Sequence, residues 1–247
     1  MASTPDSSAV SADRGSSETG AFWCSRSFFA ASPVYPILDA EAYGDHDPSP
    51  VLRALGAAGI RIVQLRGKAL PAGGFASWVS AGVRGAQGSG VHVVVNDRAD
   101  VALLAGADGV HLGQDDLSAR AARRLLGRRA VIGLSTHTPA EMELARREPA
   151  DYLAVGPVFD TATKADSAPV ISLAGVREAR ELYRGPLIAI GGISRARIRP
   201  VLAAGADAVA VISAVSGASP REIAGRARGL LDAAGSPARG RTEDSVN

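Results

Sequence analysis

Short apolar runs alternate with longer amphipathic stretches along most of the chain. Each run is rich in Val, Ile, Leu and Ala and ends in a cluster of Gly, Asp, Asn, Ser or Thr, as buried strands do. The predicted strands are residues 34–38, 61–66, 91–96, 109–112, 131–135, 152–159, 187–190 and 208–212. The stretches between them have a helical period, and the predicted helices are residues 50–58, 74–87, 98–105, 117–126, 139–147, 174–183, 195–204 and 220–234. Ser118, Thr138 and Ser194 are the expected N-caps of three helices.

This alternation predicts an α/β protein with a parallel sheet. Eight strand–helix units favour a closed (β/α)8 TIM barrel, because an open doubly wound sheet usually has fewer strands. The short helix predicted at 98–105 is the weak point, and an open sheet is the alternative. We expect a single barrel domain over residues 31–235, a mostly disordered N-terminal tail over 1–30 and a disordered C-terminal tail over 236–247. Trp23, Phe28 and Phe29 are unusual in such a tail, and we expect them to dock on the barrel.

The composition excludes several classes of protein. Apolar residues make up 46% and charged residues 21%, so the chain is neither fibrous nor disordered as a whole. A net charge of +2 with 4% aromatic residues gives no basic, aromatic surface for nucleic acid. No apolar run is long enough to span a membrane, and the first twenty residues do not resemble a secretory signal. Because Cys24 is the only cysteine, we expect no internal disulfide and a cytoplasmic location; whether the chain forms a homo-oligomer stays open.

The barrel prediction locates the functional site. Active sites in this fold lie where the strands end and the loops to the next helices begin. Polar residues are dense at these ends: Asp39, Gln64, Arg66, Lys68, Asn96, Asp97, His111, Gln114, Asp116, Ser135, His137, Thr161, Thr163, Lys164, Gly191, Gly192 and Ser213. Folding alone does not require this mixture of charges, so we expect a binding site there.

The second strand carries a cationic cluster. Gln64, Arg66 and Lys68 alternate along it, so they would point to the same side. Arg as a planar fork and Lys as a point charge suit a polyphosphate. Lys68 and Lys164 are the only lysines among 27 basic residues, which favours a specific role for a compact ammonium group. The alternative is a strand whose last residues are simply solvated.

Two carboxylates follow neighbouring strands. Asn96 and Asp97 end the third strand and Asp116 follows the fourth, so Asp97 and Asp116 could share one Mg²⁺ ion with water and phosphate oxygens. Asp115 is an alternative to Asp116. In the structural alternative, Asp97 acts as a cap or pairs with Arg98, and Asp116 is the N-cap of the next helix.

A second anion site is predicted after strands six to eight. Thr161, Thr163 and Lys164 supply hydroxyl groups and an ammonium group, and the turns around Gly192 and Ile212–Ser213 supply backbone amides. The alternative for the glycines is a pair of tight turns. His111 and His137 could each serve as a general base, but we expect both to be neutral histidines that hold loops. We expect Ser135 not to be a nucleophile, because no histidine–aspartate pair lies at a recognisable spacing.

The segments VQLRGK, VVNDR, GADGVHLGQDDL, IGLSTHT, DYLAVGPVFDTATK, IAIGGI and GADAVAVISA resemble, in order and spacing, the thiamine-phosphate synthase family. The resemblance covers about residues 35–214. It implies that a pyrimidine diphosphate and a thiazole phosphate are joined with loss of pyrophosphate, using Mg²⁺. The departures are Gly67, where the family usually has an acidic residue, and a missing glycine within residues 169–172.

The resemblance also implies roles for residues. Diphosphate and pyrimidine contacts are implied for Gln64, Arg66, Lys68, Asn96, Ser135 and Lys164; Mg²⁺ ligands for Asp97 and Asp116; and the thiazole phosphate site for Thr161, Thr163, Gly192, Ile212 and Ser213. Of these, Arg66, Lys68, Ser135 and Lys164 are expected to act in catalysis. The alternatives are the sister thiazole tautomerase, which would use a histidine near His137 for proton transfer, and a phosphate-ligand sensor without catalysis.

Overall fold

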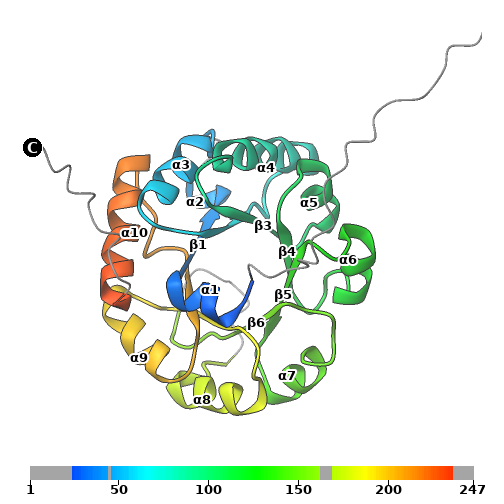
Figure 1. Ribbon diagram of the computed structural model, residues 1–247, viewed down its shortest axis with the longest axis vertical. Helices are drawn as coiled ribbons and strands as arrows, with labels where there is room; N and C mark the ends of the chain where they lie inside the picture. The colour runs from blue at the N-terminus through cyan, green and yellow to red at the C-terminus, as the bar shows by residue number, and fades with distance from the viewer. Residues whose placement is uncertain (1–23, 44–45, 162–168, 236–247) are drawn as a thin grey trace, which may run out of the picture.

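The computed structural model describes residues 24–43, 46–161 and 169–235, which form a closed parallel barrel surrounded by helices (Figure 1). Its strands pair in sequence order, and β8 closes the ring against β1. They are β1 (Val34–Asp39), β2 (Ile62–Arg66), β3 (His92–Asn96), β4 (Gly109–Leu112), β5 (Val131–Thr136), β6 (Tyr152–Val155), β7 (Leu187–Ile190) and β8 (Ala208–Val211). The barrel prediction is therefore confirmed and the open sheet is excluded.

The helices are α1 (Arg26–Ala31), α2 (Ala40–Tyr43), α3 (Ser49–Ala57), α4 (Ala72–Ala86), α5 (Ala99–Ala105), α6 (Ala119–Leu126), α7 (Pro139–Ala145), α8 (Ser172–Leu182), α9 (Ile198–Ala203) and α10 (Pro220–Ala234); the 3₁₀ turn η1 (Arg195–Arg197) precedes α9. The short α5 does form, and Gly106 in the left-handed region ends it. The side chains of Ser118 and Thr138 cap their helices as predicted. Ser194 occupies the N-cap position of η1 as predicted, but its side chain makes no capping hydrogen bond there.

Strand β6 ends at Val155, four residues before its predicted end. The next two residues are Gly156 and Pro157. Pro157 has no amide hydrogen to donate to a neighbouring strand. A Cβ on Gly156 would lie 2.2 Å from the carbonyl oxygen of Ile190, so the backbone passes close to the end of β7 there. The apolar residues that follow belong to the loop.

The core has two layers. The larger layer lies between the strands and the surrounding helices and contains side chains such as Leu52, Val79 and Val201. The smaller one fills the barrel interior and includes Tyr35, Tyr152 and Ile188. The near-continuous apolar sequence of each strand reflects burial on both faces. In the part of the chain that the structure describes, no helix has the length and apolar character needed to cross a membrane.

Helix α1 falls almost entirely within the stretch 1–30 that the sequence predicts to be mostly disordered, and it covers the amino-terminal end of the barrel, so that prediction is wrong for these residues. Phe29 is completely buried in the interior layer and meets the ring of Tyr152 edge to face, with centroids 6.0 Å apart. Arg26 forms an ion pair of 2.9 Å with Asp207, just before β8. The expected docking of Phe28 and Phe29 is confirmed, whereas Trp23 lies outside the described residues.

Replacing Phe29 with Ala should lower the free energy of unfolding by about 3–5 kcal/mol, because it leaves a cavity beneath the barrel interior. Phe28→Ala is the matched control on the same helix; its half-buried side chain should contribute less. Urea unfolding followed by circular dichroism measures both. A loss below about 1 kcal/mol in Phe29→Ala would show that its burial does not stabilise the barrel.

Candidate active site

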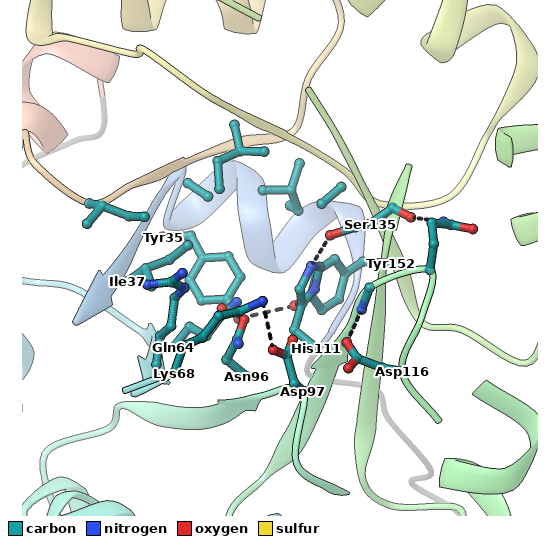
Figure 2. A pocket seen from close by; sticks show the side chains of 18 of the residues that line it. Tyr35, Ile37, Gln64, Lys68, Asn96, Asp97, His111, Asp116, Ser135 and Tyr152 are labelled. Atoms are coloured by element: carbon teal, nitrogen blue, oxygen red, sulfur yellow. Dashed lines mark hydrogen bonds and ion pairs between the residues drawn. The ribbon is translucent and has the colours of Figure 1, made fainter. Parts of the chain in front are cut away.

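A cavity opens at the carboxyl-terminal ends of the strands, where the sequence predicts the site (Figure 2). It measures about 850 Å³ with its open mouth included, which is enough for a ligand of substrate size. Every strand contributes to its wall. The predicted site residues that line it are Gln64, Arg66, Lys68, Asn96, Asp97, Asp116, Ser135 and Ile212; Tyr35, His111, His137 and Tyr152 line it as well.

The cationic cluster lies on one side of this cavity. Arg66, at the end of β2, forms an ion pair with Asp39 at the end of β1, and both side chains are nearly buried. Lys68 lies beyond the strand and is 58% exposed; its ammonium nitrogen is 3.4 Å from a carboxylate oxygen of Asp97. A buried cation is normally paired, and Asp39 fills that role for Arg66. Lys68 therefore has the greater freedom to meet a ligand.

Asp97 and Asp116 come together beside Lys68. Asp97 has a φ of 63°, a strained conformation that non-glycine residues seldom adopt away from functional sites. Burial raises the pKa of Asp116, and the neighbouring Asp97 raises it further. The structural alternatives are wrong for both residues, because Arg98 pairs with Asp100 and Ser118 caps α6. Asp116 instead accepts a hydrogen bond of 2.7 Å from the amide of Gly113.

The donor chemistry of this pair fits Mg²⁺. Among the residues that the structure describes, no group of three or more His, Cys, Asp or Glu side chains surrounds a common point, which is the arrangement of an all-protein metal cage. Mg²⁺ usually takes one or two carboxylates and completes its shell with water and phosphate oxygens. Two adjacent carboxylates, one with a raised pKa, are stabilised by a cation between them.

A hydrogen-bonded group of side chains forms the floor of the cavity. His111 bonds to Ser135 through Nε2 and to the Tyr152 hydroxyl through Nδ1, each at 2.9 Å. The prediction that His111 holds a loop is therefore wrong. It is right for His137, whose Nδ1 lies 2.6 Å from the carbonyl oxygen of Gly156 in the loop after β6.

Tyr35 and Tyr152 are the site residues that the sequence analysis missed. Their hydroxyl groups lie 3.1 Å apart, and both side chains are completely buried in the barrel interior. The sequence does carry a signal, since each is a polar aromatic residue beside apolar residues of its strand. The pattern alone does not say that the two strands face each other across a barrel.

The residues predicted for the second anion site are only partly brought together. Thr161, Gly192 and Ser213 follow β6, β7 and β8, at the same end of the barrel as the cavity, but they are not among the residues that line it. Gly191 and Gly192 have φ values of 101° and 62°, which confirms the tight turn at this point. Thr163 and Lys164 lie outside the described residues.

Comparisons with known proteins agree with this geometry. The model of the family described as thiamine monophosphate synthase matches residues 34–215. The chain belongs to the thiamine monophosphate synthase family. A thiamine-phosphate synthase from Koribacter versatilis is 41% identical over 187 residues, which cover 73% of this chain and 87% of that protein. The thiamine-phosphate synthase of Moorella thermoacetica is 39% identical over 204 residues, covering 79% and 97% respectively.

A solved structure is similar over the same region. The thiamine phosphate pyrophosphorylase of Pyrococcus furiosus superposes with a TM-score of 0.73 at 32% identity, covering 84% of this chain and 97% of that one. The structure describes both positions at which the sequence analysis noted a departure from the family pattern, Gly67 and the stretch 169–172. A Cβ on Gly67 would lie 2.7 Å from the Phe75 ring, so a side chain there displaces Phe75. Where a glycine is missing, Ser172 adopts a φ of 58°.

Proposed function

We propose that this chain joins 4-amino-2-methyl-5-hydroxymethylpyrimidine diphosphate to 4-methyl-5-(2-phosphoethyl)thiazole and releases pyrophosphate. The observation that carries the proposal is the meeting of Lys68, Asp97 and Asp116 at the mouth of a cavity whose floor is neutral and hydrogen bonding. The mouth suits a diphosphate with its counter-ion, and the floor suits an uncharged heterocycle. The family match and the names of the relatives support the same substrates.

The reaction that suits this site is a dissociative substitution. The bond between the pyrimidine methylene carbon and the diphosphate oxygen breaks, and its electron pair leaves with pyrophosphate. The amino group of the pyrimidine donates electron density to the resulting cation. The lone pair of the thiazole nitrogen then forms the new carbon–nitrogen bond, and no covalent bond to the protein is needed.

The residues of the chain act by position and charge. Lys68 would hold the departing diphosphate, and its attraction grows as negative charge gathers on the leaving oxygens. Asp97 and Asp116 would hold Mg²⁺, which, when bound, neutralises the diphosphate. Gln64, Asn96 and Ser135 would orient the pyrimidine ring, and Thr161, Thr163, Gly192, Ile212 and Ser213 would hold the thiazole phosphate. Ser135 does not act as a nucleophile in this scheme.

The observations favour a synthase over a thiazole tautomerase. A tautomerase has no diphosphate to hold and would not need the cation and carboxylates at the mouth.

Pyrophosphate release in the presence of both substrates and Mg²⁺ tests the proposal, with each substrate alone as the control. We expect release only when both are present, and isothermal titration should show that each one binds. Binding of both substrates without release would instead support the sensor. Proton exchange into the thiazole without release would support the tautomerase.

A further inference from the structure

A chain of hydrogen bonds crosses the barrel interior from Gln64 to Ser135 (Figure 2). The Gln64 amide nitrogen lies 3.4 Å from the Tyr35 hydroxyl, which lies 3.1 Å from the Tyr152 hydroxyl. Tyr152 in turn lies 2.9 Å from Nδ1 of His111, and Nε2 of His111 lies 2.9 Å from Oγ of Ser135. Both ends of this series of hydrogen bonds, Gln64 and Ser135, line the cavity. Its three middle members have no role in the reaction described above.

The Gln64 amide nitrogen, at one end, determines which group donates in each of these hydrogen bonds. The amide nitrogen of Gln64 can only donate, so the Tyr35 oxygen accepts. The Tyr35 hydroxyl is fully buried, and its remaining partner among the described residues is Tyr152, so it donates there. Tyr152 then donates to Nδ1 of His111. Burial raises the pKa of both phenols, so both retain the protons that this direction requires.

The tautomer of His111, at the Ser135 end of these hydrogen bonds, follows from this direction. Because Nδ1 of a neutral His111 accepts, its single ring proton lies on Nε2, which donates to the oxygen of Ser135. His111 is the hydrogen-bond partner of the Ser135 hydroxyl within the described part of the chain. The hydroxyl hydrogen of Ser135 is therefore left for a ligand in the cavity. The Gln64 nitrogen gives one of its two hydrogens to Tyr35, and this bond fixes the orientation of the amide, so that its oxygen is the acceptor at this end.

We propose that Tyr35 and Tyr152 are positioning residues that fix the Nε2–H tautomer of His111, so that the cavity presents a donor at Ser135 and an acceptor at Gln64. Neither tyrosine needs to touch the reacting atoms for this role. Their hydrogen bonds allow only the pattern in which Ser135 donates to a ligand and Gln64 accepts from it.

The backbone of β5 makes room for this arrangement. A Cβ on Gly133 would lie 2.4 Å from the Tyr152 hydroxyl oxygen and 2.6 Å from Nδ1 of His111. Glycine inside a strand weakens it, and such a residue often marks a close approach. Here the approach is the hydrogen bond between Tyr152 and His111, whose rings also stack with centroids 5.5 Å apart. Any larger residue at position 133 would disrupt the hydrogen bond between Tyr152 and His111.

The pattern selects a class of heterocycle, and this step rests on the proposed function. An aminopyrimidine presents a ring nitrogen that accepts beside an amino group that donates, which complements Ser135 and Gln64. In the corresponding oxo compound the ring nitrogen carries hydrogen and the oxygen accepts, so both pairs would be mismatched. A site with fixed polar groups rejects such an analogue strongly, since its own groups are left unpaired. The tyrosines thereby make the site specific for the amino compound.

The tautomer is measured without any substrate. Long-range ¹H–¹⁵N correlation spectra of protein labelled with ¹⁵N-histidine distinguish Nε2–H from Nδ1–H, and a His111→Asn variant assigns the signal. In the wild-type chain we expect the Nε2–H form of His111. In Tyr152→Phe we expect a mixture of the two forms, because Nδ1 has lost its donor. A wild-type His111 in the Nδ1–H form would overturn the proposal, whether or not the chain releases pyrophosphate.

Selectivity gives the second measurement. Isothermal titration with the amino diphosphate and with its oxo analogue yields the ratio of their dissociation constants. Tyr152→Phe should reduce this preference about tenfold, since one fixed hydrogen bond no longer opposes the analogue. Tyr35→Phe should reduce it less, because Tyr152 still donates to His111. Tyr183→Phe removes a phenol outside the chain of hydrogen bonds and should leave the ratio unchanged.

The outcomes distinguish failure of the positioning role of the tyrosines from failure of the proposed reaction. A reduced preference for the amino compound in Tyr152→Phe, at unchanged melting temperature, supports the positioning role. An unchanged preference together with an unchanged His111 tautomer in Tyr152→Phe refutes it. If the wild-type chain binds neither pyrimidine, the proposed function fails, and the histidine spectra alone decide whether the tyrosines set the tautomer.

Discussion

Asp97→Asn and Asp116→Asn should each reduce pyrophosphate release by a factor of about 10²–10³ at saturating pyrimidine diphosphate. The two carboxylates are the negative groups beside Lys68 that suit Mg²⁺, and an amide binds this cation far less well. Removing one electrostatic group that acts on developing charge commonly has an effect of this size. Steady-state release assays over a range of Mg²⁺ concentrations measure the loss, and added Mg²⁺ should restore part of it.

The same substitutions should leave the fold intact. The folded state holds the pKa of Asp116 above its unfolded value, through burial first and Asp97 second. The folded chain therefore binds the extra proton between the two pKa values, so the free energy of unfolding falls as the pH rises through that window. Asp116→Asn removes this penalty, and at neutral pH its melting temperature should equal or exceed that of the wild type. Asn also tolerates the positive φ at position 97.

A result in which both variants retain wild-type turnover would show that the carboxylates do not hold a catalytic metal. A result in which both lose activity and melt well below the wild type would show that they support the fold instead. Asp100→Asn is the matched control, because Asp100 is an exposed carboxylate in the first turn of α5 that does not line the cavity and pairs with Arg98. It should change neither quantity.

Lys68→Ala should lower turnover about 10²-fold while weakening pyrimidine diphosphate binding much less. The ammonium group attracts the diphosphate more strongly as charge builds on the leaving oxygens, so the loss falls mainly on the transition state. Lys68→Arg should recover only part of the rate, because the guanidinium group keeps the charge but is larger and planar. Release assays give turnover, and titration gives the dissociation constant.

Arg120→Ala removes an exposed cation that pairs with Glu148 and serves as the matched control. Wild-type rates in Lys68→Arg would mean that the lysine head group has no specific role, and that lysine rather than arginine occurs at this position by chance. Equal losses in turnover and binding for Lys68→Ala would show that it contributes to ground-state binding alone.

The elements of the barrel could be predicted because their sequence signals are local. Burial on both faces makes each strand apolar throughout, and the amphipathic stretches between strands have a clear helical period. The errors occur where a distant contact decides the outcome. The end of β6 depends on the close approach of Gly156 to β7, and α1 depends on the burial of Phe29 inside the barrel. Neither contact is visible in the local sequence.

The same division applies to the candidate site. The cationic cluster with Lys68 and the carboxylate pair of Asp97 and Asp116 were predicted to be neighbours, because strand ends in a parallel barrel meet at one rim and order along the chain is enough to bring them together. The pairing of Arg66 with Asp39 was not predicted, because it depends on the register between β1 and β2.

The sequence by itself determined the fold class, the end of the barrel that carries the site and the charged groups at its mouth, since strand period and strand order are properties of the chain. Only the tertiary structure decided what lies beneath them. Tyr35, His111 and Tyr152 are far apart in sequence, and closure of the barrel places them within hydrogen-bond distance. Their partners are fixed by packing across the interior, where a buried polar group must find a partner, and no local pattern encodes which one it meets.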